Sequence, residues 1–165
     1  MYEKENISAN TFGYERVHWP NLKADLESYL NSLKRPNERY GPWVDEKVVN
    51  WLKKNMNGYT KNNDLIDFYS TDPGDKAIEI KYITVGGSYR TSFLQYNKLR
   101  DMELDRKNPA TETRRKPYIL GATLAKPKPY SKKENWYINI FRPGTRPIIT
   151  HTSVTGKKSY WIEPP

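Results

Sequence analysis

Four of the charged residues in one short stretch lie within segments that otherwise have the pattern of two apolar strands. The stretch NDLIDFYSTDPGDKAIEIKYIT covers residues 63–84 and contains Asp64, Asp67, Glu79 and Lys81. Because successive side chains of a strand point to opposite faces, Glu79 and Lys81 share one face. Only one of the two aspartates can join them, and the alternation of the strand does not determine which one.

This combination of residue types suits the hydrolysis of a phosphodiester. The reaction needs neutralisation of charge on the transferred phosphate, a water that acts as the nucleophile, and help for the leaving oxygen. Two carboxylates can hold a hard divalent ion, which neutralises charge and lowers the pKa of water. A lysine two residues from the glutamate can orient or deprotonate that water and face the phosphate. An aspartate followed by Glu-x-Lys is therefore the residue set that this reaction requires.

The composition favours one folded domain whose metal ligands, if it binds a metal, are carboxylates. A chain of 165 residues is long enough for a single domain with its own core, and aromatic residues make up 13% of it. The chain has no cysteine and only 2 histidines, which excludes thiolate catalysis and zinc sites built from cysteine or from several histidines. It has no long apolar run and no apolar signal core near its start, so we expect a cytoplasmic protein without a membrane span.

The charge is distributed unevenly along the chain. The net charge is +9, and residues 1–85 carry 12 basic and 13 acidic groups, whereas residues 86–165 carry 16 basic and 6 acidic groups. A basic half that follows directly on the acidic cluster suits a protein that holds a phosphate backbone with one region and uses carboxylates in another.

The periodicity of the chain predicts a mixed α/β fold. Apolar residues recur at helical spacing in three segments, residues 20–35, 41–55 and about 92–106, the last capped by Ser92. Alternating or apolar runs predict strands at 64–70, 76–84, 118–125 and 136–142, and a final hairpin that turns near Thr155-Gly156. The turn sequence TDPGD joins the first two strands, so we expect them to form an antiparallel hairpin.

The run from Asp64 to Ile78-Glu79-Ile80-Lys81 resembles the signature of the PD-(D/E)xK nuclease superfamily, in which an aspartate begins one strand and E-x-K ends the next. It is most similar to the active-site strands of type II restriction endonucleases, and also resembles those of Holliday-junction resolvases. The resemblance implies an α/β fold with a mixed sheet and a restriction-endonuclease-like core, made of a helix, a β-meander, a helix and a strand. That order is similar to the elements expected between residues 42 and 141. We therefore expect a single nuclease domain over residues 1–165, with an N-terminal helix and a C-terminal hairpin added to the core.

The same resemblance implies roles for the residues of the cluster. Asp64, Glu79 and Lys81 would be the catalytic residues, with Lys81 activating the attacking water. Asp64, Glu79 and the backbone carbonyl of Ile80 would bind Mg²⁺, for which Mn²⁺ can substitute. Asp67 would then have a supporting or structural role.

Members of this superfamily often carry a further acidic residue on the helix before the meander and a polar residue on the helix after it. Glu46 is the candidate metal ligand on the first helix, with Asp45 as its competitor, and Gln95 matches the second. The segment VGGSYRTS follows the strand of Glu79, and its two glycines permit close approach of a DNA strand. The candidate DNA-binding residues are Ser88, Tyr89, Arg90, Thr91, Gln95, Arg114, Arg115 and Lys116.

We therefore expect a metal-dependent endonuclease that hydrolyses double-stranded DNA, most simply a type II restriction endonuclease. Such an enzyme acts as a homodimer, because two nicks on opposite strands are most simply made by two active sites related by a two-fold axis. A Holliday-junction resolvase or another structure-selective nuclease is the alternative within this class. Outside it, the alternatives are a non-catalytic nucleic-acid-binding protein whose basic half provides salt-dependent affinity, and a purely structural or protein-binding role.

Overall fold

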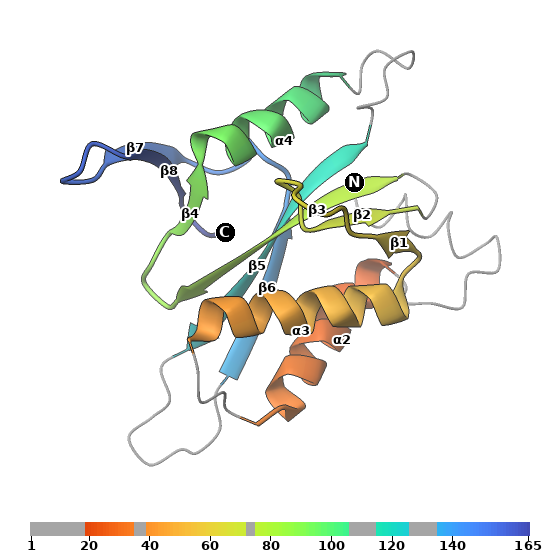
Figure 1. The fold of residues 1–165 in the computed structure, drawn as a ribbon. Helices are drawn as coiled ribbons and strands as arrows, with labels where there is room; N and C mark the ends of the chain where they lie inside the picture. The colour runs from red at the N-terminus through yellow and green to blue at the C-terminus, as the bar shows by residue number, and fades with distance from the viewer. Residues whose placement is uncertain (1–18, 35–38, 72–74, 106–114, 126–134) are drawn as a thin grey trace.

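The structure is a computed structural model that describes residues 19–34, 39–71, 75–105, 115–125 and 135–165 (Figure 1). These residues form a mixed α/β fold with three helices, a mixed five-stranded sheet and a separate three-stranded sheet. The helices are α2 (Trp19–Ser32), α3 (Tyr40–Asn55) and α4 (Phe93–Asp105). The strands are β1 (Gly58–Tyr59), β2 (Phe68–Ser70), β3 (Lys76–Thr84), β4 (Tyr89–Ser92), β5 (Lys116–Ala125), β6 (Asn135–Phe141), β7 (Ile148–Thr152) and β8 (Lys158–Ile162).

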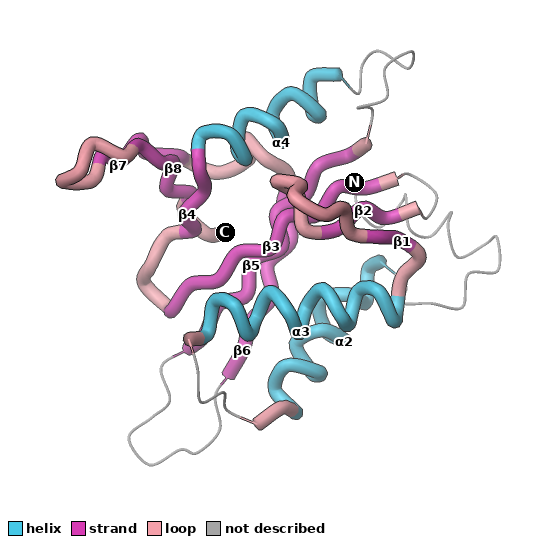
Figure 2. The backbone as a smooth tube through the Cα atoms, in the orientation of Figure 1, coloured by secondary structure: helices cyan, strands magenta, loops and turns pink. Residues whose placement is uncertain are grey.

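The larger sheet has the strand order β1-β2-β3-β5-β6. Strands β3 and β5 pair in parallel, and the other neighbours pair antiparallel. The chain passes through β4 and α4 between β3 and β5, which provides the long crossover that parallel neighbours need. Figure 2 shows α4 on one side of this sheet and α2 and α3 on the other. None of the described helices is long and apolar enough to cross a membrane.

Each face of the larger sheet has its own apolar core. On one face, Ile78 and Ile80 of β3 pack against apolar side chains that recur at helical spacing on α2 and α3. On the other face, Ile83 of β3 packs in a cluster with Leu99 of α4 and Ile162 of β8. Strand β5 is buried along nearly its whole length, because both of its faces are covered.

Helix α2 also protects the outer edge of the sheet at β6. The backbone N–H groups of Ile138 and Trp136 donate to the side chains of Glu27 and Asn31, each at 2.7 Å. The side-chain amide of Asn31 donates in turn to the Trp136 carbonyl at 3.2 Å. These bonds satisfy edge groups that would otherwise be available for pairing with another chain.

Most of the elements expected from the sequence are confirmed. All three helices are present, and the Ser92 hydroxyl caps α4 by accepting a hydrogen bond from the Gln95 N–H at 3.1 Å. The antiparallel pairing of β2 with β3, the strands β5 and β6, and the final hairpin β7–β8 are also present. The expected turn residues Pro73 and Gly74 lie outside the described residues.

Two features of the strands differ from expectation. The strand expected at 64–70 begins only at Phe68, because the Asp64 carboxylate accepts a hydrogen bond from the Ile66 N–H and holds residues 64–66 in a turn. Strands β1 and β4 were not expected; β4 pairs with β8 and extends the final hairpin to a three-stranded sheet with the order β4-β8-β7.

Gly121 in β5 gives a test of the packing between the two sheets. A Cβ atom at Gly121 would overlap the ring of Tyr89, which is fully buried and hydrogen-bonded through its hydroxyl group to Thr123 at 2.9 Å. We expect Gly121→Ala to lower the free energy of unfolding by roughly 1–3 kcal/mol, because the ring cannot move away without losing its contacts. Urea denaturation measures the change.

Gly41→Ala is the control, because a Cβ atom at this position in α3 meets no atom within 4 Å apart from its chain neighbours and the adjacent helix backbone. It should change the free energy of unfolding less than Gly121→Ala, since the helical preference of alanine is offset by the following Pro42. Equal stability of the Gly121→Ala and Gly41→Ala proteins would contradict the close packing of Tyr89 on β5.

Candidate active site

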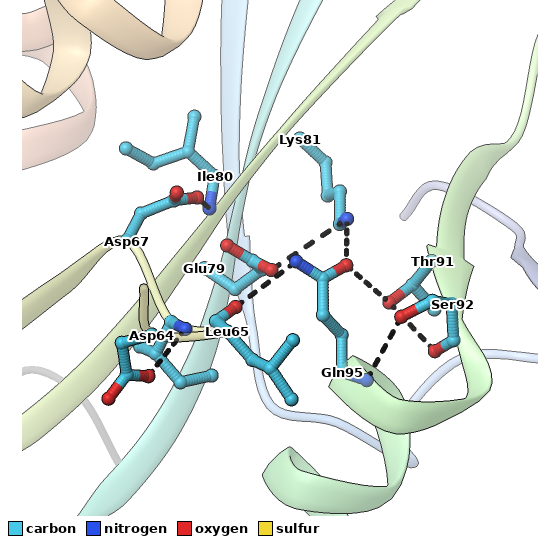
Figure 3. Close-up of polar contacts among 10 residues, drawn as sticks. Asp64, Leu65, Asp67, Glu79, Ile80, Lys81, Thr91, Ser92 and Gln95 are labelled. Atoms are coloured by element: carbon cyan, nitrogen blue, oxygen red, sulfur yellow. Dashed lines mark hydrogen bonds and ion pairs between the residues drawn. The ribbon is translucent and has the colours of Figure 1, made fainter. Parts of the chain in front are cut away.

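The candidate site lies where β2 and β3 stop pairing. Phe68 pairs with Ile78, and Asp67 and Glu79 are the next residues on the two strands, so they are neighbours across the opening. The Ile80 N–H donates to Asp67 Oδ2 at 2.8 Å instead of to a backbone carbonyl of β2 (Figure 3). Because the N–H and C=O groups of a strand residue point to the same side, the Ile80 carbonyl also faces this opening.

Asp64 makes a different set of contacts. Its Oδ1 atom accepts hydrogen bonds from the Ile66 N–H at 2.9 Å, the Tyr69 hydroxyl at 2.8 Å and Lys98 Nζ at 2.9 Å. Burial opposes ionisation of this carboxyl group, but the hydrogen bonds from Lys98, Ile66 and Tyr69 outweigh it and lower the pKa of Asp64. In Figure 3 the Asp64 carboxylate is turned away from Glu79. The structure thus brings Asp67, and not Asp64, to Glu79, because the hairpin register places Asp67 opposite it.

Glu79 is a buried carboxyl group without a hydrogen-bond donor. Its side chain is 1% exposed, and neither of its oxygen atoms accepts a hydrogen bond from any described residue. Lys81 Nζ lies 3.8 Å from Glu79 Oε2. Burial first, and then the adjacent Asp67 carboxylate, raise the pKa of Glu79 to about 10, although the charge of Lys81 opposes the shift. Without a bound cation, Glu79 is therefore protonated at neutral pH.

Gln95, near the start of α4, holds Lys81 in place. Lys81 Nζ donates to Gln95 Oε1 at 2.9 Å, and Gln95 Nε2 donates to the Leu65 carbonyl at 3.1 Å (Figure 3). The Ser92 cap fixes the first turn of α4 and therefore the position of the glutamine. One amide side chain thus links β3, α4 and the turn that precedes β2.

Helix α3 contributes Asp45 to the site, and not Glu46. Asp45 lines the same cleft as Lys81, and burial together with the charge of Asp67 raises the pKa of Asp45 to about 6 while Lys81 opposes the shift. The Glu46 side chain is 66% exposed and lies 4.0 Å from Lys47. Successive residues of a helix are separated by about 100°, so only one of two neighbours can face the sheet.

A cleft of about 490 Å³ is shared by Asp45, Ile80 and Lys81 and by the three-stranded sheet, whereas Asp67 and Glu79 are not among its lining residues. Its lining residues come from the start of α3, the end of β3, the glycine-containing loop after β3, and the small sheet. They are Gly41, Asp45, Ile80, Lys81, Tyr82, Ile83, Thr84, Gly86, Gly87, Ser88, Arg90 and Trp161.

Because side chains alternate along β4, the four residues expected to contact DNA in this segment do not all point to the cleft. Ser88 and Arg90 line the cleft. Tyr89 and Thr91 are only 0% and 2% exposed, so their side chains point into the core and do not line the cleft, unlike the DNA contacts expected for them. Their inward direction follows from strand alternation, which the sequence did not reveal because the segment did not have the pattern of a strand.

The basic residues expected near the start of β5 lie away from the cluster. Arg115 stacks on aromatic rings of β1 and β2 and donates to the Ser70 carbonyl. Lys116 is partly buried, and burial together with the charge of Arg142 lowers the pKa of Lys116. In the pairing of β3 with β5, Lys81 lies beside Gly121. Lys116 is five residues before Gly121, so it lies roughly 16 Å from that position along β5. Arg114 lies outside the described residues.

Asp45 and Trp161 are residues of the cleft that the sequence did not select as candidates. Asp45 was only a competitor of Glu46, and helical spacing alone did not distinguish them. Trp161 gave no signal beyond its place in the expected final hairpin, since nothing in the local sequence shows that this hairpin pairs with β4.

The donor atoms at the opening suit a hard divalent cation. The described residues contain no group of three or more acidic or histidine side chains arranged to hold a metal ion. However, Mg²⁺ in proteins commonly uses one or two carboxylates, with water and substrate phosphates as its other ligands. Glu79 has two oxygen atoms that lack a donor, and Asp67 and the Ile80 carbonyl face the same opening. These three groups therefore fit Mg²⁺ or Mn²⁺.

No protein-family model matches the chain, and no curated protein or solved structure shows significant similarity to it.

The buried Glu79 carboxyl group should make the ion-free protein less stable as the pH rises. The folded protein keeps this proton up to about pH 10, whereas the unfolded chain loses it near the ordinary pKa of 4.5. Between these values the folded state binds more protons, so the free energy of unfolding falls by up to about 1.4 kcal/mol for each unit of pH. Asp45, with its pKa of about 6, adds a similar decline at lower pH.

Urea denaturation in EDTA between about pH 7 and about pH 9, above the titration of Asp45, isolates the contribution of Glu79. The wild-type protein should lose stability across this range, and Glu79→Gln should lose clearly less. Equal slopes for the two proteins would contradict the raised pKa of Glu79.

Proposed function

We propose that this protein is a divalent-metal-dependent endonuclease of the PD-(D/E)xK type that hydrolyses double-stranded DNA. The observation that carries the proposal is the arrangement of Asp67, Glu79 and Lys81 around the opening between β2 and β3, with Gln95 fixing the lysine. The order of elements supports it, because α3, the meander β1-β2-β3, α4 and β5 follow one another as in the restriction-endonuclease-like core.

In this proposal Asp67, Glu79 and the Ile80 carbonyl hold Mg²⁺, which supplies positive charge for the phosphate and favours the ionised form of Glu79. The ammonium group of Lys81 orients the attacking water and contacts an oxygen of the phosphate. Gln95 keeps that ammonium group beside Glu79 through its 2.9 Å hydrogen bond. The metal-binding role that the resemblance gave to Asp64 is thus assigned to Asp67.

Asp64 has a structural role in this arrangement. Its bond to Lys98 ties the turn before β2 to α4, and its bond to the Ile66 N–H fixes the turn itself. Leu65 lies within this turn and supplies the carbonyl that accepts from Gln95. Asp64 therefore acts on the site through the residues that position Lys81.

The choice of DNA as the substrate is supported by the basic second half of the chain, residues 86–165. The proposal includes a homodimer, which would place one active site on each strand of the duplex, and a cytoplasmic location. Light scattering coupled to size-exclusion chromatography measures the oligomeric state directly.

Cleavage of a large linear DNA in the presence of Mg²⁺ tests the proposal. We expect the wild-type protein to give discrete fragments. EDTA should lower the rate by at least about 100-fold because it removes the metal ion, and Lys81→Ala should do so because the water then lacks its orienting group. Lys53→Ala, which removes an exposed lysine from the last turn of α3, is the charge-matched control and should cut like the wild type.

The same assay, run on four-way junctions and RNA as well as on linear DNA, shows which type of nucleic acid is cut. Cleavage restricted to four-way junctions would replace the restriction-type activity by a structure-selective one. Failure to cut linear DNA, junctions and RNA under these conditions would overturn the nuclease proposal as a whole.

A second pair of variants distinguishes the two aspartates. Asp67→Asn removes a charge beside Glu79 and should lower the cleavage rate by at least about 100-fold, while DNA binding in Ca²⁺ persists. Asp64→Asn loses the ion pair with Lys98 but keeps an oxygen that accepts from the Ile66 N–H and the Tyr69 hydroxyl and so holds the turn. It should therefore lower the free energy of unfolding by roughly 1–2 kcal/mol with little change in the cleavage rate. If only Asp64→Asn abolished cleavage, Asp64 and not Asp67 would be the ligand.

A further inference from the structure

The three-stranded sheet has one face in the core and one face that continues the cleft. In its register, Tyr89 pairs with Ile162 and Thr91 with Tyr160, and these four side chains pack inward or lie partly buried against the core cluster. The residues between them point to the other face. That face carries Arg90, Ser92, Ile149, His151, Ser159 and Trp161.

Three of these side chains form a stack on the outward face. Arg90 of β4 lies over the Trp161 ring, with its Cζ atom 4.5 Å from the ring centroid. His151 of β7 stacks on the same ring with a centroid separation of 4.2 Å and an angle of 20° between the planes. Since β8 lies between β4 and β7, the indole is held between a side chain from each neighbouring strand. We call these three residues the Arg90–Trp161–His151 stack.

The stack leaves the hydrogen-bonding groups of Arg90 available. A guanidinium group that packs on an aromatic ring uses its flat face and keeps its in-plane N–H groups free to donate. Arg90 is exposed, and it makes no hydrogen bond or ion pair with the residues that the structure describes. Arg115 and Arg142, by contrast, donate to backbone carbonyls. Arg90 is thus an oriented donor without an acceptor from the described part of the chain.

The position of the stack relates it to the proposed catalytic cluster. Arg90 and Trp161 line the same cleft as Lys81 and Asp45, and the loop of Gly86 to Ser88 lines it as well. Figure 1 shows β4 and β8 next to the start of α4, the helix that supplies Gln95. A strand of DNA whose phosphate reached Lys81 would therefore extend along the cleft toward the stack. The surplus of basic residues in the second half of the chain favours a polyanion over another protein as the occupant.

We propose that the Arg90–Trp161–His151 stack is the surface that contacts the DNA nucleotides beside the cleaved phosphate, with Arg90 donating its paired N–H groups to the DNA. The inference rests on the proposed nuclease function and adds the residues that position the substrate. Trp161 acts through Arg90 by holding the guanidinium group in one orientation, which lowers the entropy lost when it binds. His151 supports the opposite face of the same ring.

DNA binding without cleavage tests this inference. The probe is a fluorescein-labelled, mixed-sequence DNA duplex long enough to span the protein, and anisotropy is measured in Ca²⁺. Arg90→Ala and Trp161→Leu should each weaken binding by roughly tenfold, and the double variant should be little weaker than either single one, because both changes remove the same contact. Arg90→Lys should recover only part of the loss, since lysine cannot form paired hydrogen bonds.

Two control variants match the changes in chemistry. Lys53→Ala removes a positive charge from α3, and Tyr137→Leu removes an aromatic side chain that is 50% exposed on β6. Both should bind the duplex like the wild type. Thermal unfolding of every variant checks that it is folded. If Trp161→Leu does not fold, the DNA affinity of Arg90→Ala, which changes only an exposed side chain, tests the role of the stack.

The salt dependence identifies which part of the DNA Arg90 contacts. The slope is that of the logarithm of the binding constant against the logarithm of the salt concentration. If its magnitude falls by about 1 in Arg90→Ala, the side chain contacts a phosphate. If the slope is unchanged but the variant no longer distinguishes duplexes of different sequence, the side chain contacts a base edge. Either result supports the contact.

The outcomes separate this inference from the proposed function. Wild-type binding by Arg90→Ala and Trp161→Leu, together with normal Mg²⁺-dependent cleavage by the wild-type protein, would overturn the role of the stack and leave the nuclease proposal intact. A changed oligomeric state in these variants with unchanged DNA affinity would identify the face as a contact between two copies of the chain. No binding of the duplex by the wild-type protein, even at low salt, would overturn both proposals.

Discussion

The separation of β2 from β3 is the constraint on which the site depends. Had the two strands continued to pair, the Ile80 N–H would donate to a backbone carbonyl, and the opening would be filled by a regular ladder. Instead the Asp67 carboxylate accepts that hydrogen bond at 2.8 Å, so a side chain replaces the missing strand. The substitution places a carboxylate next to Glu79 and leaves the Ile80 carbonyl facing the same space.

The turn that precedes β2 maintains this separation. The three hydrogen bonds to Asp64 keep residues 64–66 out of the sheet, and Lys98 fastens the turn to α4. Gln95 on the same helix bonds both to this turn and to Lys81. Helix α4 thus sets the position of the lysine and of the turn together, and a shift of the helix would move both.

The buried Glu79 carboxyl group lowers the stability of the ion-free protein at neutral pH, because the folded chain keeps a proton that the unfolded chain releases. A buried carboxyl group without a donor is rarely retained in a structure unless a ligand or a reaction uses it. Its neighbours Asp67 and Asp45 disfavour its ionised form further. A bound cation would remove this disadvantage, because it supplies the positive charge that the described residues provide only through Lys81 at 3.8 Å.

The sequence by itself determined the mixed α/β class, the helices, the β2–β3 hairpin, and the placement of Glu79 and Lys81 on one strand face. Each of these depends on local periodicity or on turn and capping residues, which a short window of sequence contains. The choice between Asp64 and Asp67 could not be made in this way, because both lie in the same segment and only the pairing register selects one.

The tertiary structure alone decided the rest of the site. Asp45 faces the cleft and Glu46 does not, because the packing of α3 on the sheet fixes the rotation of the helix. Arg90 and Trp161 become neighbours only when β4 pairs with β8, and that contact joins segments far apart in the chain. Local propensity carries no information about such pairing, since it arises from the burial of two sheets around a shared core.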